Sequence, residues 1–328
     1  QINTLDTADI VALGTDIANI GSTAEAAFTS TQLGALTSAQ AATLDSADIS
    51  AFTSNAFNGL TTANLNALTS AAIAGLTPEQ VDTLSTEDVQ ALGTDIANMN
   101  TSAMASVDSV QVAALTTAQI ALLDSADVAA MTSDAMVGLS SAQVAALSTS
   151  AFNALSTADL VALTSNAMAG ITSAQVNTLD TADIVALGTD IANLGSVAEA
   201  ALTSTQIGAL TTAQVATLDS ADVAALTSSA FDGFTTADLE ALTSSAIAGM
   251  TAAQVDTLST ADVQALGGDI ANMNASAIAS LDSAQVQALT TAQIAALDSA
   301  DVAALTSDAL VGLTSAQVAA LSTSAFAA

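Results

Sequence analysis

Lysine, arginine and histidine are entirely absent from this chain of 328 residues. Its 32 acidic residues therefore give a formal net charge of −32. Nucleic acids are bound largely through Lys and Arg, which displace counterions from phosphates, and anionic membrane surfaces attract the same side chains. We therefore expect no nucleic acid and no anionic membrane surface among the partners of this protein.

Cysteine is also absent, which excludes disulfides and thiolate metal sites. Serine and threonine are abundant, but without His, Lys or Cys the chain lacks an ordinary base to activate a hydroxyl nucleophile. We predict that the chain is not an enzyme and needs no cofactor.

Long apolar runs are missing too, although 51% of the residues are hydrophobic and the mean hydropathy is +0.58. Polar residues interrupt every stretch well before the roughly 20 apolar residues that a membrane span needs. We therefore predict no membrane insertion. Because the sequence begins at Gln1 without a signal peptide and ends inside a repeat, we expect a processed protein or a segment of a longer one.

What is present is an eight-residue repeat, which we call a word, with slot one taken by a large apolar residue. The word Leu139-Ser-Ser-Ala-Gln-Val-Ala-Ala146 is followed at once by Leu147. Four words have only seven residues and begin at Leu13, Leu92, Leu187 and Leu266. Short words in tandem predict a solenoid, in which each repeat is stabilised by its neighbours.

A longer period of 174 residues contains these words, because Gln1 to Ile10 returns, with Val in place of Ile2, as Gln175 to Ile184. We therefore divide the chain into a first long repeat, 1–174, and a truncated second copy, 175–328, of one continuous solenoid. From Leu13 to Leu92 to Leu187 the seven-residue words define modules of 79 and 95 residues, which differ by two words.

Slot five alternates between polar residues and alanine from Leu123 to Ile171. Words with Ala there carry a bulky slot six, such as Met136 or Phe152, and often Gly in slot eight, such as Gly138. Two alternating word types suggest two sides per coil, so we predict about two words, or 16 residues, per turn.

Each word has the signals of a short helix. Thr77-Pro-Glu-Gln80 places Thr at the N-cap, Pro at the first helical position and Gln three residues after the cap, as in a capping box. Glycine in slot eight, such as Gly59, predicts a C-terminal cap with positive φ. We predict an all-α solenoid of very short capped helices in which slots one and six are buried. The alternative is a β-solenoid, which the Thr and Val content supports and the apolar spacing opposes.

Paired aspartates three residues apart are the main candidate functional residues. Catalysis by such a pair is a weaker explanation than helix capping, because the pair recurs in every module. Calcium is the better functional interpretation, since oxygen ligands are all that the chain offers. The calcium candidates are Asp45, Asp48, Asp124, Asp127, Asp219, Asp222, Asp298 and Asp301, and Asp6/Asp9 and Asp180/Asp183 have the same spacing.

The seven-residue words carry a second set of aspartates after Gly-Thr or Gly-Gly. Asp16, Asp95, Asp190 and Asp269 are candidates for ligand loops. We favour the interpretation that these words drop one residue and thereby bend the solenoid or reset its register.

Words such as Leu115-Thr-Thr-Ala-Gln-Ile-Ala-Leu122 resemble the repeat tracts of very large secreted or surface-exposed bacterial proteins that are described as adhesins. The resemblance implies an extracellular or cell-surface location and a structural or adhesive role. We expect a self-associating building block of a filament, stalk or matrix, and alternatively a spacer that projects a separate binding domain. Divalent cations are a further expected partner of so acidic a chain.

Overall fold

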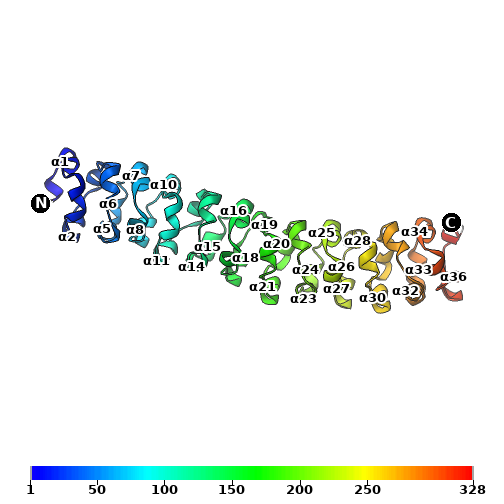
Figure 1. The fold of residues 1–328 in the computed structure, drawn as a ribbon. Coiled ribbons are helices and arrows are strands. Elements are labelled where there is room, and N and C mark those ends of the chain that lie inside the picture. The colour runs from blue at the N-terminus through cyan, green and yellow to red at the C-terminus, as the bar shows by residue number, and fades with distance from the viewer. Residues whose placement is uncertain (1, 327–328) are drawn as a thin grey trace. The chain divides into compact units, whose positions relative to one another are not determined.

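The computed structural model describes residues 2–326, and these fold into two compact units that meet in sequence between Gly170 and Ile171. Within residues 2–326 every regular element is a helix (Figure 1). The prediction of an all-α fold is therefore confirmed, and no strand of the β-solenoid alternative occurs in this part of the chain.

Almost every word forms one helix of four to six residues. The α-helices of the first unit are α1 (Thr7–Ala12), α2 (Ser22–Glu25), α3 (Ser30–Gly34), α4 (Ser38–Ala41), α5 (Ser46–Ala51), α6 (Ser54–Phe57), α7 (Thr62–Ala67), α8 (Ser70–Ile73), α9 (Pro78–Val81), α10 (Thr86–Ala91), α11 (Thr101–Met104), α12 (Ser109–Ala114), α13 (Thr117–Ile120), α14 (Ser125–Ala130), α15 (Ser133–Met136), α16 (Ser141–Ala146), α17 (Thr149–Phe152), α18 (Thr157–Ala162) and α19 (Ser165–Met168).

The second unit repeats this arrangement. Its α-helices are α20 (Ser173–Val176), α21 (Thr181–Ala186), α22 (Ser196–Glu199), α23 (Ser204–Ile207), α24 (Thr212–Val215), α25 (Ser220–Ala225), α26 (Ser228–Phe231), α27 (Thr236–Ala241), α28 (Ser244–Ala248), α29 (Ala252–Val255), α30 (Thr260–Ala265), α31 (Ala275–Ala279), α32 (Ser283–Ala288), α33 (Thr291–Ala296), α34 (Ser299–Ala304), α35 (Ser307–Leu310), α36 (Ser315–Ala320) and α37 (Thr323–Phe326).

The seven-residue words form 3₁₀ helices instead, and a further short one precedes α1. They are η1 (Ile2–Thr4), η2 (Gly14–Asn19), η3 (Gly93–Asn98), η4 (Gly188–Asn193) and η5 (Gly267–Asn272). A 3₁₀ helix rises further per residue than an α-helix, so a word that is one residue short still fills a helix position in its turn.

Most α-helices start where a hydroxyl, amide or carboxylate in slot two caps them, whereas α2 and α22 follow Gly21 and Gly195 and have no side-chain cap. In α16 the Ser140 Oγ accepts the backbone N–H of Gln143, and the Gln143 side chain accepts the N–H of Ser140, which completes a capping box. Thr77-Pro-Glu-Gln80 forms the predicted box with Pro at the first helical position. In most of the six-residue helices slot one ends the helix in an extended conformation, as Leu115 does with φ −61° and ψ 139°. Where a seven-residue word follows, slot one stays helical, as Leu92 does with φ −59° and ψ −17°.

Three words, not two, complete one turn of the solenoid. α14 packs against α17, α15 against α18, and α16 against α19, so each helix contacts the helix three positions along the chain. Side-chain hydrogen bonds agree, because Asn100 bonds to the carbonyl oxygen of Leu76, 24 residues earlier. The prediction of 16 residues per turn is therefore wrong. The alternation shows that every second word is alike. It does not show how far the chain turns at each word, and that angle sets the number of words per turn.

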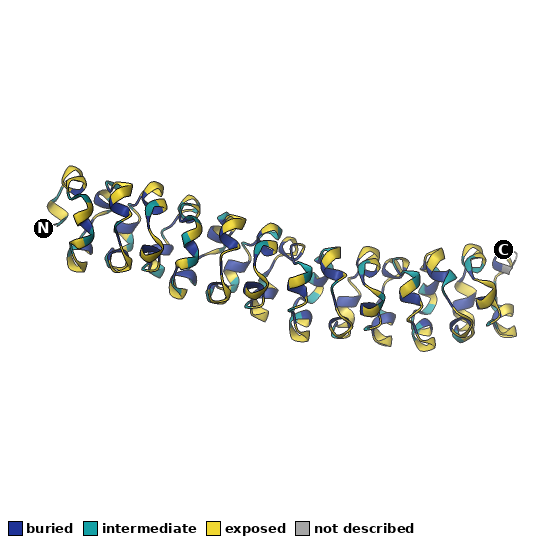
Figure 2. Cartoon of the chain, in the orientation of Figure 1, coloured by how far each residue is buried: buried dark blue, intermediate teal, exposed yellow. Residues whose placement is uncertain are grey.

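Slots one, five and six form the interior of each unit, and slots two to four lie nearer the surface (Figure 2). Leu139 is 4% exposed and Val144 is fully buried, as predicted for slots one and six. Slot five was not expected to be buried, yet Gln143 in that slot is only 3% exposed. The core of each unit therefore contains polar side chains from slot five among its apolar layers.

Glycine in slot eight does not have the predicted positive φ. Gly249, for example, has φ −82°, and the glycines with positive φ among residues 2–326 are Gly14, Gly21, Gly93, Gly188 and Gly267. Slot-eight glycines are needed instead because two backbones approach closely. A Cβ on Gly138 would lie 2.0 Å from the carbonyl oxygen of Ser109 in the turn before.

Candidate functional site

The paired aspartates cap helices. Asp124 Oδ1 accepts the backbone N–H groups of Ala126 and Asp127 at 2.7 and 3.0 Å, and Asp127 Oδ2 accepts the N–H of Asp124 at 3.0 Å. A carboxylate at a helix N-terminus also interacts favourably with the helix dipole. The same reciprocal bonds are present at Asp6/Asp9, Asp45/Asp48, Asp180/Asp183, Asp219/Asp222 and Asp298/Asp301.

In this geometry, half of the carboxylate oxygens that could coordinate a cation already accept backbone hydrogen bonds. In each pair one oxygen of the first aspartate and one of the second already accept backbone N–H groups. Across the described residues 2–326, no three acidic side chains come together in a way that could hold a metal ion. The structure thus brings the calcium candidates together only two at a time, and calcium binding remains a prediction.

Burial raises the pKa of the second aspartate in some of these pairs. The pKa values of Asp127, Asp183 and Asp301 are raised, first because burial disfavours the charged carboxylate and then because the first aspartate of each pair is also negative. The hydrogen bond from the backbone N–H of the partner opposes this effect and lowers each pKa.

The aspartates of the seven-residue words also have structural contacts. Asp95 Oδ1 accepts the hydroxyl of Ser70 at 2.7 Å, and Asp269 Oδ1 accepts that of Ser244 at the same distance. Gly93 provides the positive φ of +57° that starts η3. η3 packs between α8 and α13, so the seven-residue word changes its local conformation and keeps its place in the turn.

A ladder of buried amides is the polar feature that the sequence did not reveal. In slot five, Gln143 accepts the N–H and the hydroxyl of Ser140 through Oε1. Its Nε2 donates to the carbonyl oxygens of Val112 and Leu115 in the turn before, both at 2.8 Å. Equivalent bonds to the preceding turn are made by Gln32, Gln40, Gln80, Gln111, Gln119, Gln206, Gln214, Gln254, Gln285, Gln293 and Gln317.

The amide ladder solves a problem inherent in very short helices. A helix of four to six residues leaves most of its C-terminal carbonyls without an intrahelical partner, and here those carbonyls face the core. Where slot five is glutamine, as at Gln143, one side chain satisfies two of these carbonyls and also caps its own helix. The recurrence of Gln in slot five of many words is the signal from which this could have been inferred.

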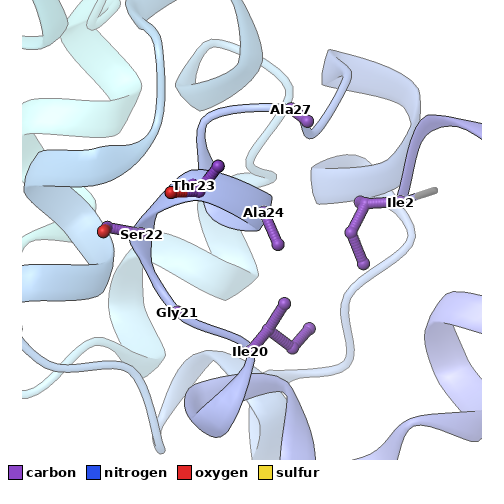
Figure 3. Close-up of a pocket in the computed structure, with 7 residues that line it drawn as sticks. All are labelled: Ile2, Ile20, Gly21, Ser22, Thr23, Ala24 and Ala27. Atoms are coloured by element: carbon purple, nitrogen blue, oxygen red, sulfur yellow. The ribbon is translucent and has the colours of Figure 1, made fainter.

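A hollow with a volume of about 630 Å³ lies against α2 (Figure 3). Ile2, Ile20, Ala24 and Ala27 contribute apolar side chains, and Ser22 and Thr23 contribute hydroxyls. At the corresponding point after η3, α11 packs against α9, so an added turn would fill this hollow.

Comparison of the sequence with known protein families identifies the repeat. The model of the ALTTAQ repeat matches residues 41–78, 120–157, 152–189, 231–267, 268–299 and 294–328, which together make up more than half of the chain. The chain belongs to the ALTTAQ repeat family. Tandem repetition, inferred from the words, is thereby confirmed. No curated protein matches the sequence significantly.

The ALTTAQ motif itself has a structural meaning in this protein. It occurs as Ala114-Leu-Thr-Thr-Ala-Gln119, in which Leu115 is 5% exposed and belongs to the core. Thr116 caps α13, and Gln119 completes the capping box and bonds to the carbonyl oxygen of Val89 in the turn before. The residues of an ALTTAQ repeat are thus those that build and stack one short helix.

No helix among residues 2–326 is long and apolar enough to cross a membrane.

Proposed function

We propose that this ALTTAQ repeat protein is a structural protein, a building block of an extracellular filament, stalk or matrix. The observation that carries the proposal is that the most regular chemistry of the chain serves to join one turn to the next. The slot-five glutamines bond between turns, as Gln143 does to Val112, and the serines of slot three add bonds such as Ser125 to Ser150.

Two further observations support a structural role. The paired aspartates are engaged in helix caps in every module. The chain contains no Lys or Arg, so it offers trypsin-like proteases no cleavage site, which suits a durable molecule outside the cell.

A second candidate function is a spacer that projects a separate binding domain of a large surface adhesin. The charge distribution favours it, because 32 carboxylates without one basic residue oppose side-by-side association. Association would therefore have to rely on the large exposed apolar side chains, which are mostly valines. They are Val11, Val110, Leu122, Val137, Val161, Val185, Val197, Leu310, Val311 and Val318.

Electron microscopy of the native material, combined with light scattering of the purified chain, tests the proposal. A building block should give a periodic assembly whose repeat matches a whole number of turns. Single chains that stay monomeric at millimolar concentration, and that lead to a separate folded domain in the native material, would replace the building block with the spacer. A hydrolytic or transfer activity of the purified chain would contradict both.

A further inference from the structure

Slot six is a core position, and two words place a carboxyl group there. In the word that follows each seven-residue word, slot six is taken in turn by Glu25, Met104, Glu199 and Ile278. Met104 is 1% exposed and Ile278 fully buried, as the core requires. Glu25 and Glu199 are 3% and 5% exposed, so each buries a carboxyl group where the sister module buries a hydrocarbon.

The surroundings of Glu199 contain only two other titratable groups. α22, which ends at Glu199, packs against α20 and α25. Asp222, from α25, lines the same small cavity as Glu199, within reach of a side-chain hydrogen bond between the two carboxyl groups, and Asp219 adds a negative charge nearby. α20 carries no titratable residue. The other residues that line this cavity are apolar, and they are Ile191, Leu202, Ile207, Leu210, Leu218 and Leu226.

A hydrogen bond between two carboxyl groups needs a proton, because two carboxylates are acceptors only. Asp222 Oδ2 already accepts the N–H of Asp219 at 2.7 Å, and Glu199 Oε1 has no hydrogen-bond partner. The adjoining cavity of about 10 Å³ has room for about one water molecule and none for a hydrated cation. A proton is therefore the only cation that can neutralise this pair in place.

The Glu25–Asp48 pair repeats this arrangement in the first long repeat. α2 packs against α5, Asp48 Oδ2 accepts the N–H of Asp45 at 2.9 Å, and Glu25 Oε1 is likewise without a partner. Asp48 and Asp45 are the acidic groups that act on Glu25. Equivalent positions in the two copies of the long repeat thus carry the same pair of acids.

We propose that each Glu–Asp pair is a proton-dependent clamp between successive turns, closed by one shared proton and opened when that proton is lost. This device goes beyond the proposed structural role and does not depend on it. When the clamp opens, two buried carboxylates repel each other, so α22 separates from α25 and α2 from α5.

The direction of the pH dependence follows from the acid pair. Burial, together with the hydrogen bond and charge of Asp222, raises the pKa of Glu199 to about 8, and the same causes with Asp48 raise that of Glu25 to about 7. A folded-state pKa above the ordinary 4.5 means that the folded protein holds a proton that the unfolded chain releases. The clamp is thus fully effective below about pH 4.5, weakens as the pH rises, and is lost above about pH 8.

Hydrogen exchange of the intact chain, corrected for the intrinsic pH dependence of exchange, tests this inference. Between pH 6 and pH 9 we expect the opening of α22 and α25 to increase about tenfold or more. The equivalent helices α11 and α14, in which Met104 and Asp127 take the positions of Glu199 and Asp222, serve as an internal control and should open much less. Equal changes in both pairs of helices would overturn the proposal.

Two variants separate the clamp from the general effect of charge. Glu199→Met copies the sister module and should abolish the extra opening of α22 and α25 at pH 9. Glu240→Gln removes one charge from an exposed site and should leave the extra opening unchanged. A Glu199→Met protein that opens as steeply with pH as the unchanged chain would refute the clamp.

A direct titration gives an independent readout. In carbon-13 spectra of the side-chain carboxyls, Glu199 should titrate well above the exposed glutamates, and Asp222→Asn should shift its midpoint downward, because the carboxylate partner is lost. A Glu199 midpoint close to that of Glu240 would contradict the shared proton.

Discussion

The Gln143 Nε2 lies 2.8 Å from the carbonyl oxygen of Val112, one turn earlier in the solenoid. Both atoms are buried, so the bond replaces contacts with water that neither atom can recover in the folded state. The bond joins a buried side chain of one helix to a backbone carbonyl of a helix in the turn before, and equivalent glutamine bonds recur along each unit.

Gln143→Glu should therefore be strongly destabilising at neutral pH. The added oxygen would face the carbonyls of Val112 and Leu115, where the amide now donates two bonds. We expect a loss of about 3 kcal/mol or more, since a buried charged group left without a donor costs more than a neutral one. Urea denaturation followed by circular dichroism measures it. Gln90→Glu is the control, because Gln90 donates one exposed bond, to Ala114, and a similar loss there would show that the buried ladder is not special.

Gly138→Ala should disrupt a close backbone contact. Its Cβ would lie 2.0 Å from the Ser109 carbonyl oxygen, and forcing an extra methyl group into a packed site costs about 1–3 kcal/mol. Gly268→Ala should be neutral or slightly stabilising, because a Cβ there meets nothing within 4 Å and φ is not positive. Gly93→Ala has open space but φ +57°, and should cost about 1–2 kcal/mol. Thermal melts of the three variants should rank Gly268, Gly93 and Gly138 in increasing order of damage, or the proposed reason for slot-eight glycine is wrong.

Leu139→Asp should unfold the turn that contains it. Leu139 is 4% exposed, and a carboxylate without a partner in an apolar layer is strongly disfavoured. We expect a loss of about 3–5 kcal/mol, the scale of a large core truncation. Val137→Asp, two residues away at a site that is 51% exposed, should change stability by less than about 0.5 kcal/mol. Similar losses in the free energy of unfolding for the two variants, measured by chemical denaturation, would show that Leu139 is not a core residue and Val137 a surface residue.

Asp127→Asn should stabilise the protein, and more so as the pH rises. Asn64 occupies the same slot, where it accepts the N–H of Thr61 and donates to the carbonyl oxygen of Leu36 at 2.9 Å. Burial raises the pKa of Asp127 above 3.8, so the folded protein loses stability as this carboxyl ionises, and an amide avoids that loss.

The gain from Asp127→Asn should reach about 1 kcal/mol at pH 7 and shrink toward pH 4. Asp127→Ala is the matched control, and it should instead lose about 1 kcal/mol because the capping bond to Asp124 is removed. Melts at both pH values would decide the matter, and an Asn variant whose gain is the same at pH 4 and pH 7 would show that ionisation of Asp127 plays no part.

Association of the chains should increase as the pH falls toward the sequence pI of about 4.1. Thirty-two carboxylates without one basic residue repel any second copy at neutral pH, and protonation or divalent cations remove that repulsion. Calcium or magnesium should act more strongly than sodium at equal ionic strength. Light scattering and electron microscopy would show it, and chains equally dispersed at pH 4 and pH 8 would refute the prediction.

Local structure could be predicted from the sequence because the information is local. The hydroxyl or carboxylate in slot two, Pro78 and the spacing of Leu139 and Val144 specify where each helix starts and which side it buries. The number of words per turn could not be predicted in this way, because it depends on how successive helices close around a shared core. The amide ladder was missed for the same reason, since the carbonyls that Gln143 satisfies belong to another turn.

Closure by three words explains how the chain can lengthen by two. The modules from Leu13 to Leu92 and from Leu92 to Leu187 differ by 16 residues, which is less than a full turn, so the words after an insertion move to a different side of the solenoid. They fit there because words of both types form the same kind of short helix with slots one and six buried. Words with Ala in slot five alternate with words that have a polar residue there, and Gly138, from a word with Ala, lies against Ser109, from a word with Gln. Adding one word of each kind keeps this order. Adding words in pairs therefore keeps this alternation, and with it the close contact between a slot-eight glycine and the turn before.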